Sequence, residues 1–546
     1  MLALYFPAAR AGFVTDFTGW LDQVQNHTFS EYVNRSNFKV VSLYQFTQVV
    51  TWVFYQLFGI NAWLWHLLFI TLHVINATLA AVLFAGMSRD VGADNYKGAV
   101  YAGAVMFCIT PYISEVIVWE PSFHYLQGLL MILLILRCVQ LYIHNPKNKY
   151  AWIAGLIYLA STHTLEVFYI TPWLVLSLAL FYRHRLSKEG ALFSKLLLLF
   201  FLPEVIMFIL RLAEYRLLHG DWVSRVGSDV AMTITDTGLG KGGKHIFNLL
   251  FMGRFIPYDL PIAGTTFGAI KNAIYSFCDS TTGIYLFYGI GIAVLIWGTI
   301  RFHKLAGRGK VMLILVLWTG LTLILVAPLW FDDMMLIIYD RYTYFTSLFL
   351  FMLVTLVICS IGNKYLRIGV LVILMLVNLR YAVQAGRYWS KSSHIVNNLL
   401  ENIPVEEGKI TLLLNNPENM RGVPMIGSWP ESEYKLMHNL LVPENPINGK
   451  VYDVLSYNMV APTDGVHVEV LNDSMIRVTH NQWGTWYWYK GFGGYSYENE
   501  DYNLNMINGH FYELTVTKPM SEYTFLFQVG DQWKVVDINR KNEEQY

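Results

Sequence analysis

Residues 59–87, GINAWLWHLLFITLHVINATLAAVLFAGM, form an apolar stretch without any aspartate, glutamate, lysine or arginine. A helix needs roughly 20 apolar residues to cross the hydrocarbon core of a membrane, so this stretch is long enough to span it. Of the 546 residues in the chain, 55% are hydrophobic and 14% are charged. A soluble domain usually carries about 25% charged residues. The sequence therefore predicts an integral membrane protein.

Apolar runs of spanning or nearly spanning length follow one another along the first 385 residues. They lie at 59–87, 98–114, 125–143, 150–168, 169–182, 192–218, 283–300, 311–330, 343–361 and 366–385. With the short apolar segment 1–9, they predict about eleven transmembrane helices. Short loops rich in lysine and arginine alternate with longer loops that carry acids, at 10–58, 112–124, 219–282 and 331–342. Because positive loops stay in the cytoplasm, we expect the acidic loops on the outer side.

The composition changes near Gly386, where hydrophobic runs shorten and asparagine, glycine and glutamate become more frequent. Six short segments after this point show alternating apolar residues and are separated by turn residues, which is typical of strands. They lie at 410–414, 466–471, 475–479, 485–489, 511–517 and 523–529. We therefore expect a transmembrane domain at 1–385 and a soluble, β-rich domain at 386–546 on the outer side. The predicted fold class is a polytopic α-helical membrane protein with a C-terminal β-rich domain.

Composition also excludes several classes of protein. The formal net charge is zero, so the chain lacks the basic surface that nucleic-acid binding requires. Three of the 4 cysteines lie in apolar segments, so the sequence predicts neither a disulfide framework nor a CxxC metal site.

The first outer loop contains acids close to a membrane boundary. Asp16 and Asp22 lie in the segment GFVTDFTGWLDQVQNHTFSEY, residues 12–32. A carboxylate at such a boundary is costly to desolvate, so it usually has a partner or a task. The structural alternative is a solvated acid that caps a helix.

Four segments of the chain share motifs with a known family. They are FGIN followed by His66, His73 and Asn76; ITPYISEVIVW with Glu115; STHTLEVFYITP with Glu166; and APLWFDDMMLIIYDRYTYFTS with Arg341, Tyr342 and Tyr344. In this order and on consistent membrane sides, they resemble GT-C glycosyltransferases of the tetratricopeptide-bearing transmembrane O-mannosyltransferase type and their bacterial relatives. The resemblance covers roughly residues 1–385, and the β-rich domain replaces the tetratricopeptide repeats.

The resemblance implies a GT-C-like transmembrane catalytic domain and roles for particular residues. Asp16 would be the catalytic base, with Asp22 as the second acid of the loop and Glu115 as a further site acid. The leaving phosphate gathers charge and needs fixed donors. A guanidinium fork suits phosphate oxygens, which favours Arg341 for this role, assisted by Tyr342 and Tyr344. The alternative for Arg341 is snorkelling or pairing with Asp340.

Other polar residues are candidates for supporting roles. Arg254 lies in NLLFMGRFIPYDLP, which favours an amphipathic helix on the outer face and makes Arg254 a second phosphate ligand. Glu120 and His124 are i, i+4 and would share a helix face, where they could bind acceptor sugar or a divalent ion. His66 and His73 are interpreted as inter-helix hydrogen-bond partners. Glu166 is expected to support a helix break before Pro172.

The function expected from the resemblance is transfer of a sugar from a polyprenyl-phosphate donor to an acceptor hydroxyl outside the cytoplasm. The acceptor is left open between protein, glycan and lipid. Bound metal is not required when an arginine holds the phosphate, although some relatives use a divalent cation. The alternatives are a transporter or flippase of a lipid-linked sugar and an O-antigen-type ligase or polymerase. We expect a multi-pass protein of a bacterial inner membrane, with its acidic loops and β-rich domain in the periplasm, in contact with membrane lipids.

Overall fold

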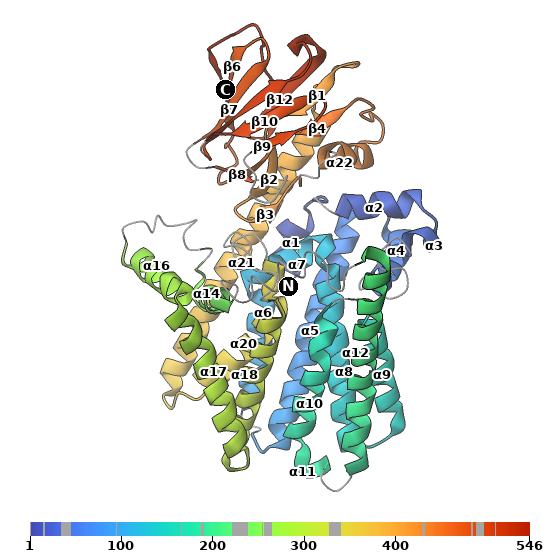
Figure 1. Cartoon of the computed structure of the whole chain (residues 1–546). Coiled ribbons are helices and arrows are strands. Elements are labelled where there is room, and N and C mark those ends of the chain that lie inside the picture. Colours follow the sequence, from blue (N-terminus) through green and yellow to red (C-terminus); the bar gives the residue numbers. More distant parts are fainter. Residues whose placement is uncertain are drawn as a thin grey trace.

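The structure is a computed structural model of the whole chain (Figure 1). It describes residues 2–14, 17–33, 45–93, 96–164, 166–186, 190–220, 239–253, 255, 265–326, 340–427, 432–481, 484–487, 496–507 and 509–546. Long helices form a bundle, and the C-terminal strands form a separate layer at one end of that bundle.

Helices dominate the first part of the chain. Those that build the bundle and its ends are α1 (Leu2–Ala9), α2 (Phe17–Asn26), α3 (Phe29–Val33), α4 (Gln45–Phe58), α5 (Ala62–Asp90), α6 (Lys97–Ile109), η2 (Pro111–Ile113), α7 (Ser114–Val118), η3 (Glu120–Ser122), α8 (Phe123–His144), α9 (Asn148–Ser161), η4 (Glu166–Ile170), α10 (Thr171–Phe181), α11 (Arg183–Leu186), α12 (Gly190–His219), α14 (Leu239–Phe251), α16 (Thr266–Asp279), α17 (Thr281–Arg301), η6 (Phe302–Lys304), α18 (Gly307–Val326), η8 (Asp340–Thr343), α20 (Tyr344–Ile358) and α21 (Lys364–Glu401).

Within the described part of the chain, seven helices are long and apolar enough to cross a membrane, or eight when one bent pair is counted. Each of the apolar runs predicted from the sequence falls on a helix, which confirms a polytopic helical membrane protein. The number is lower than about eleven because α1 is only 8 residues long and the 150–182 stretch is divided into shorter pieces. Of those pieces, α9 has 14 residues and Phe168–Phe181 is a short apolar helix.

A sharp bend separates α6 from the segment that follows it. The axis turns by 59° between Lys97–Ile109 and Pro111–Val118. Pro111 has no backbone N–H and fixes its own φ, so a straight helix cannot continue through it. The bend turns the 98–114 run sideways at the end of the bundle, and α7 then runs on from η2.

Close packing places α20 against α6. A Cβ added at Gly103 would lie 2.7 Å from the Cα of Met352, so only glycine permits this approach of the two helices. The adjacent η8, which leads into α20, contacts α7 and η2. Gly103 therefore helps to bring the segment around Arg341 beside the segment around Glu115.

The described residues of the C-terminal region form three sheets, the helix α22 and the 3₁₀ turn η9. Its elements are β1 (Ile410–Leu413), β2 (Asn416–Met420), β3 (Val423–Pro424), α22 (Glu433–Leu441), β4 (Val451–Asp453), β5 (Ser456–Met459), β6 (Val466–Asn472), β7 (Met475–His480), β8 (Thr485–Tyr487), β9 (Ser496–Glu498), β10 (Tyr502–Met506), β11 (Phe511–Val516), η9 (Met520–Glu522), β12 (Tyr523–Val529), β13 (Gln532–Val535) and β14 (Glu544–Gln545). The strand orders are β13-β12-β1-β4, β14-β6-β7-β11-β10-β9 and β3-β2-β5-β8. β1 pairs in parallel with β12 and β4, whereas the six-stranded sheet is antiparallel. All six strand segments expected from the sequence carry strands, so the β-rich C-terminal region is confirmed.

Helix α21 connects the bundle to the sheets without a break. It is 38 residues long and passes through Gly386, where the composition predicted a domain boundary. Its last turns supply Ile395, Val396, Leu399 and Leu400 to the hydrophobic core of the β-rich region. Since these side chains are packed among the strands, the end of α21 is part of the β-rich core.

A buried carboxylate ties the turn before β10 to neighbouring segments. Asp501 accepts hydrogen bonds from Lys518 at 2.8 Å, Tyr452 at 2.8 Å and Lys450 at 3.1 Å. Burial raises the pKa of Asp501, but these donors outweigh it and hold the pKa at about 2. The carboxylate is therefore charged at neutral pH, and it links β10 to β4 and to the segment before η9.

Polar contacts mark the end of the bundle that lies away from the sheets. At the end away from the sheets, Asp90 accepts a hydrogen bond from Tyr182 at 2.7 Å and lies 2.9 Å from His144, and Arg308 donates to Tyr96 at 2.8 Å. The basic α11 lies at this end in Figure 1. At the other end, α2, α4 and α7 lie beside the β-rich region. The assignment of these ends to the cytoplasm and the periplasm stays a prediction.

Candidate active site

An ion pair joins two segments that the sequence singled out separately. The backbone N–H of Arg341, in η8, donates to Oε2 of Glu115 at 2.8 Å, and its guanidinium Nη1 pairs with Oε1. The Glu115 side chain is 2% exposed and that of Arg341 is 14% exposed. A buried charge is tolerated when it is paired and hydrogen-bonded. The carboxylate of Glu115 therefore fixes both the backbone and the side chain of Arg341.

Aromatic rings complete the surroundings of this guanidinium. The Arg341 Cζ lies 4.4 Å from the ring centroid of Trp119 and 4.7 Å from that of Tyr342. Its Nη2 also lies 3.3 Å from the Tyr342 hydroxyl. Ring faces attract cations, so the two rings restrict the guanidinium to one orientation.

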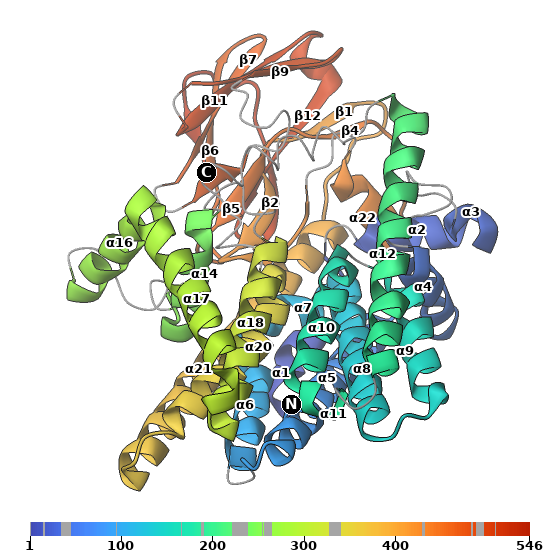
Figure 2. The same cartoon turned by 60° about the horizontal axis from the view of Figure 1, so that its bottom comes forward.

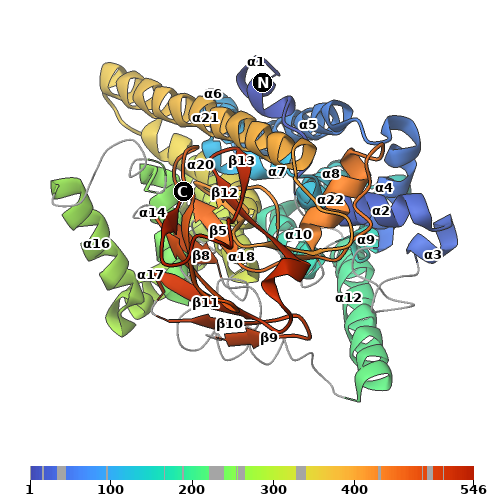
Figure 3. The same ribbon diagram turned by 90° about the horizontal axis from the view of Figure 1, so that it is seen from above.

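A polar cavity of about 1120 Å³ opens where Arg341 reaches the end of the bundle. Its walls come from α2, from the start of α8 and from α22 of the β-rich region. Figure 2 and Figure 3 show α22 beside α2 at the level where the bundle meets the sheets. The described lining residues are Gly19, Trp20, Asp22, Gln23, Gln25, Asn26, Trp119, Pro121, His124, Arg341, Ser432, Glu433, Lys435, Leu436, Asn439 and Leu440.

Side-chain contacts hold α22 over the bundle. Thr18 of α2 donates to Oε1 of Glu433 at 3.1 Å in a buried contact. Ser432 caps the helix, accepting from the backbone N–H of Lys435 at 3.1 Å. On the other side, the backbone N–H of Gly12 donates to Ser393 of α21 at 2.6 Å. The wall of the cavity formed by α22 is therefore joined directly to the bundle segments that form the opposite wall.

An apolar pocket of about 430 Å³ lies close to the polar cavity. It is lined by Phe46, Val50, Phe54, Leu72, Phe123, Gln127, Leu130, Met131, Leu134, Leu156, Ile157 and Ala160, from α4, α5, α8 and α9. The successive residues Phe123 and His124 line the apolar pocket and the polar cavity respectively. The start of α8 therefore has an apolar hollow on one side and a polar hollow on the other.

Glu120 and His124 have different surroundings. Glu120 lies in η3 and contacts His66, with 2.8 Å between its Oε1 and Nε2 of the imidazole. The other ring nitrogen of His66 lies 3.0 Å from the carbonyl of Ala9. Glu120 and Pro121 belong to the 3₁₀ turn η3, which leads directly into α8 at Phe123. His124 lines the polar cavity, whereas Glu120 is fully buried.

His73 and Tyr344 meet in the interior between α5 and α20. Nδ1 of His73 lies 2.9 Å from the Tyr344 hydroxyl, and Asn76 donates to that hydroxyl at 3.3 Å. All three residues are fully or almost fully buried. Contacts of this kind join neighbouring helices in a membrane. Tyr344 is not among the described residues that line either hollow.

The remaining candidates are placed only in part. Asp22 lies on α2, lines the polar cavity and accepts a hydrogen bond from Asn26 at 2.8 Å. Asp16 and Arg254 lie outside the described residues. Glu166 begins η4, and its side chain also lies outside the described part. Asp16 immediately precedes α2, and Arg254 follows α14 after two residues.

In the part of the chain that the structure describes, no cluster of three or more histidine, cysteine, aspartate or glutamate side chains is arranged to hold a metal ion. The use of a divalent cation, which the resemblance leaves open, is not tested by this result.

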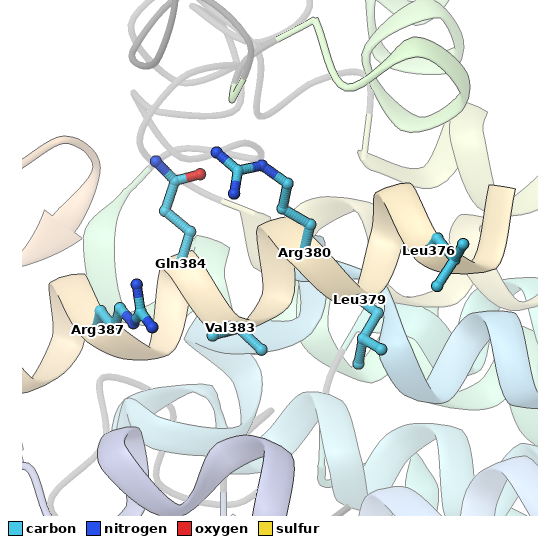
Figure 4. A pocket seen from close by; sticks show the side chains of 6 residues that line it. All are labelled: Leu376, Leu379, Arg380, Val383, Gln384 and Arg387. Carbon is cyan, nitrogen blue, oxygen red and sulfur yellow. The ribbon is translucent and has the colours of Figure 1, made fainter. Parts of the chain in front are cut away.

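A third hollow, of about 580 Å³, runs along α21. Figure 4 shows that Arg380 and Gln384 extend from one side of the helix, while Leu376, Leu379 and Val383 provide apolar walls. Arg387 completes the lining on the side toward the β-rich region. The hollow combines apolar side chains with two arginines, but it is separate from the polar cavity.

The contribution of α22 to the polar cavity was not predicted from the sequence. A helix was predictable there, because Ser432 is a good N-cap and Tyr434, Met437 and Leu441 follow with helical spacing. No local signal shows that Glu433 and Lys435 lie opposite α2, since this depends on how the β-rich region sits on the bundle.

Comparisons with known proteins were made for the whole chain. No protein-family model and no curated protein matches it. Among solved structures, the chain is similar to ArnT from Cupriavidus metallidurans bound to undecaprenyl phosphate, with 12% identity and a TM-score of 0.30 over 84% of this chain and 91% of that chain. The apo state of the same ArnT gives 12% identity and a TM-score of 0.29 over the same shares.

Proposed function

We propose that the chain is an integral-membrane glycosyltransferase that moves a sugar from a polyprenyl-phosphate donor to an acceptor hydroxyl outside the cytoplasm. One observation carries the proposal: a polar cavity containing Arg341 lies beside an apolar pocket at the same end of α8. A lipid-linked sugar has the same two parts, a charged head and an apolar tail. Binding sites place a few polar groups within a largely apolar hollow.

Arg341 would hold the phosphate, and Glu115 would position Arg341. Both carboxylate oxygens of Glu115 contact Arg341, so this acid is better suited to orienting the guanidinium than to taking a proton. Asp16 would be the base. As the acceptor oxygen bonds to the anomeric carbon, its proton passes to the Asp16 carboxylate. The bond from that carbon to the phosphate oxygen breaks, and its electron pair leaves with polyprenyl phosphate.

Two alternatives have different requirements. A transporter or flippase of a lipid-linked sugar needs a polar path through the bundle. Both hollows that support the proposal instead involve the start of α8, close to α2 and α4. An O-antigen-type ligase or polymerase would use the same donor chemistry and differ only in the acceptor. The position of the cavity at one end therefore favours a transferase.

The proposal places the cavity on the periplasmic side of a bacterial inner membrane. Lysine and arginine in the opposite loops set this orientation. Alkaline phosphatase, which is active only outside the cytoplasm, should be active when it is fused after Tyr546. β-Galactosidase fused at the same position should be inactive. The reverse pattern would show that the cavity faces the cytoplasm and would rule out a periplasmic acceptor.

Filling the apolar pocket tests the proposed position of the lipid tail. Ala160→Trp places a large ring in the pocket, so we expect transfer from a long-chain polyprenyl-phosphate sugar to fall about tenfold, since each displaced methylene contributes about 0.8 kcal/mol. Transfer from a donor whose chain is too short to enter the pocket should change little. The measurement is the apparent KM of the purified chain for both donors.

The matched control for this test lies on the same helix. Leu159 is 51% exposed and does not line the pocket, so Leu159→Trp should leave both donors unaffected. Equal losses for long and short donors would contradict the position of the tail. Absence of transfer by the wild-type chain from any polyprenyl-phosphate sugar would contradict the function itself.

A further inference from the structure

The walls of the polar cavity carry side chains suited to hydroxyl groups. The amides Gln23, Gln25 and Asn26 line it, and Asn26 also donates to Asp22. Asn439 and Ser432 line it too, with Asn439 hydrogen-bonded to the backbone of Ile447 and Ser432 capping α22. An amide offers an acceptor oxygen and two donor hydrogens, and so matches a hydroxyl that both donates and accepts. Several such groups around one hollow favour an occupant with many hydroxyls.

Two tryptophans add flat apolar surfaces to the same cavity. Trp20 comes from α2 and is half-buried, and Trp119 lies almost fully buried against Arg341. Indole faces carry negative charge density, and the C–H groups on one face of a pyranose ring carry partial positive charge. A sugar ring can therefore stack on Trp20 while its hydroxyls reach the amides.

Charge in the cavity is balanced between the two walls. Asp22 and Glu433 are acids, and Lys435 and Arg341 are bases. A strongly acidic occupant would be repelled by the two acids, and a strongly basic one by the two bases. Only Leu436 and Leu440 are aliphatic among the described lining residues larger than proline, so an acyl chain would find little apolar wall. These features disfavour a lipid and a highly charged polymer.

We propose that this cavity binds the acceptor, and that the acceptor is an uncharged oligosaccharide held between α2 and α22. That the bound molecule is the acceptor rests on the proposed function. The binding site itself is argued from the cavity alone. With the donor phosphate at Arg341, the surfaces left for the acceptor are Trp20, Gln23 and the facing residues of α22. Because α22 belongs to the β-rich region, that region supplies half of the site.

The test measures glycan binding by the full-length chain in detergent, without any donor. The probe is a panel of immobilised oligosaccharides, some neutral and some sulfated or carboxylated. The wild-type chain should bind neutral members. Trp20→Ala should weaken this binding about tenfold, a loss that corresponds to about 1.4 kcal/mol. Gln23→Ala, a milder change on the same helix, should weaken it by a smaller factor.

The control is Gln56→Ala, an exposed position on α4 that does not line the cavity, which should bind as the wild type does. Binding of neutral glycans without any sugar transfer would leave the site standing and overturn the proposed function. Sugar transfer to a lipid or peptide, with no neutral glycan bound, would overturn the oligosaccharide inference and leave the transferase standing. Wild-type affinity in both cavity variants would also overturn the inference.

Discussion

Replacing Asp16 by Asn is expected to lower the rate of sugar transfer by about 10²–10⁴-fold, the usual cost of losing a general base. The amide keeps the shape of the carboxylate but does not accept the proton of the acceptor hydroxyl. Donor binding should be unchanged, because the phosphate is assigned to Arg341. The measurement is turnover by purified, folded protein at saturating donor and acceptor, with donor affinity measured separately.

Asp22→Asn is the matched comparison for this experiment. It makes the same chemical change in the same loop, at a residue on α2 that lines the polar cavity. We expect it to raise the apparent KM for the acceptor with little change in turnover. If Asp16→Asn works at the wild-type rate and Asp22→Asn does not, the base is Asp22, within the same site and reaction class.

Removing Arg341 is expected to damage both donor binding and folding. Arg341→Ala leaves the buried carboxylate of Glu115 without its cation, and breaking a buried ion pair from one side typically costs about 3–5 kcal/mol. Loss of a charged hydrogen bond to phosphate should weaken donor binding about tenfold to a hundredfold. Arg341→Lys should recover only part of the donor affinity, because an ammonium lacks the two-pronged geometry.

A double variant separates these two effects. Glu115→Gln combined with Arg341→Gln removes both charges, so it should regain thermal stability relative to Arg341→Ala while donor binding stays weak. Thermal unfolding in detergent and donor binding by calorimetry measure the two quantities independently. If the double variant binds the donor as tightly as the wild type, Arg341 is a structural partner of Glu115 and the phosphate is held elsewhere.

The lengths of the apolar runs predicted the helices, because a segment that spans a membrane must form its backbone hydrogen bonds within itself. This constraint acts locally, and the predicted runs fall on helices for that reason. Strands were predictable from alternation in 466–471 and 475–479, which became β6 and β7. The short strands β2 and β5 lack alternation, since nearly all of their side chains are buried, and they were missed.

The candidate site was predictable as a set of residues but not as an arrangement. Glu115 and Arg341 are 226 positions apart, and their pairing depends on the packing of α7 against η8. The same holds for His66, whose partner Glu120 is 54 positions away. Spacing grouped Glu120 with His124, whereas in the structure Glu120 contacts His66 and His124 lines the polar cavity. Local periodicity does not show which distant residue a side chain contacts.

Helix α21 has a consequence for the geometry of catalysis. Its 38 residues rise roughly 57 Å at 1.5 Å per residue, against a hydrocarbon core about 30 Å thick. Since its far end is packed into the β-rich core, its length fixes the distance between the bilayer and α22. One inserted residue would lift that core by about 1.5 Å and rotate it by about 100° relative to α2. On the proposed function, the length of this helix thus sets how far above the lipid surface the reacting hydroxyl is presented.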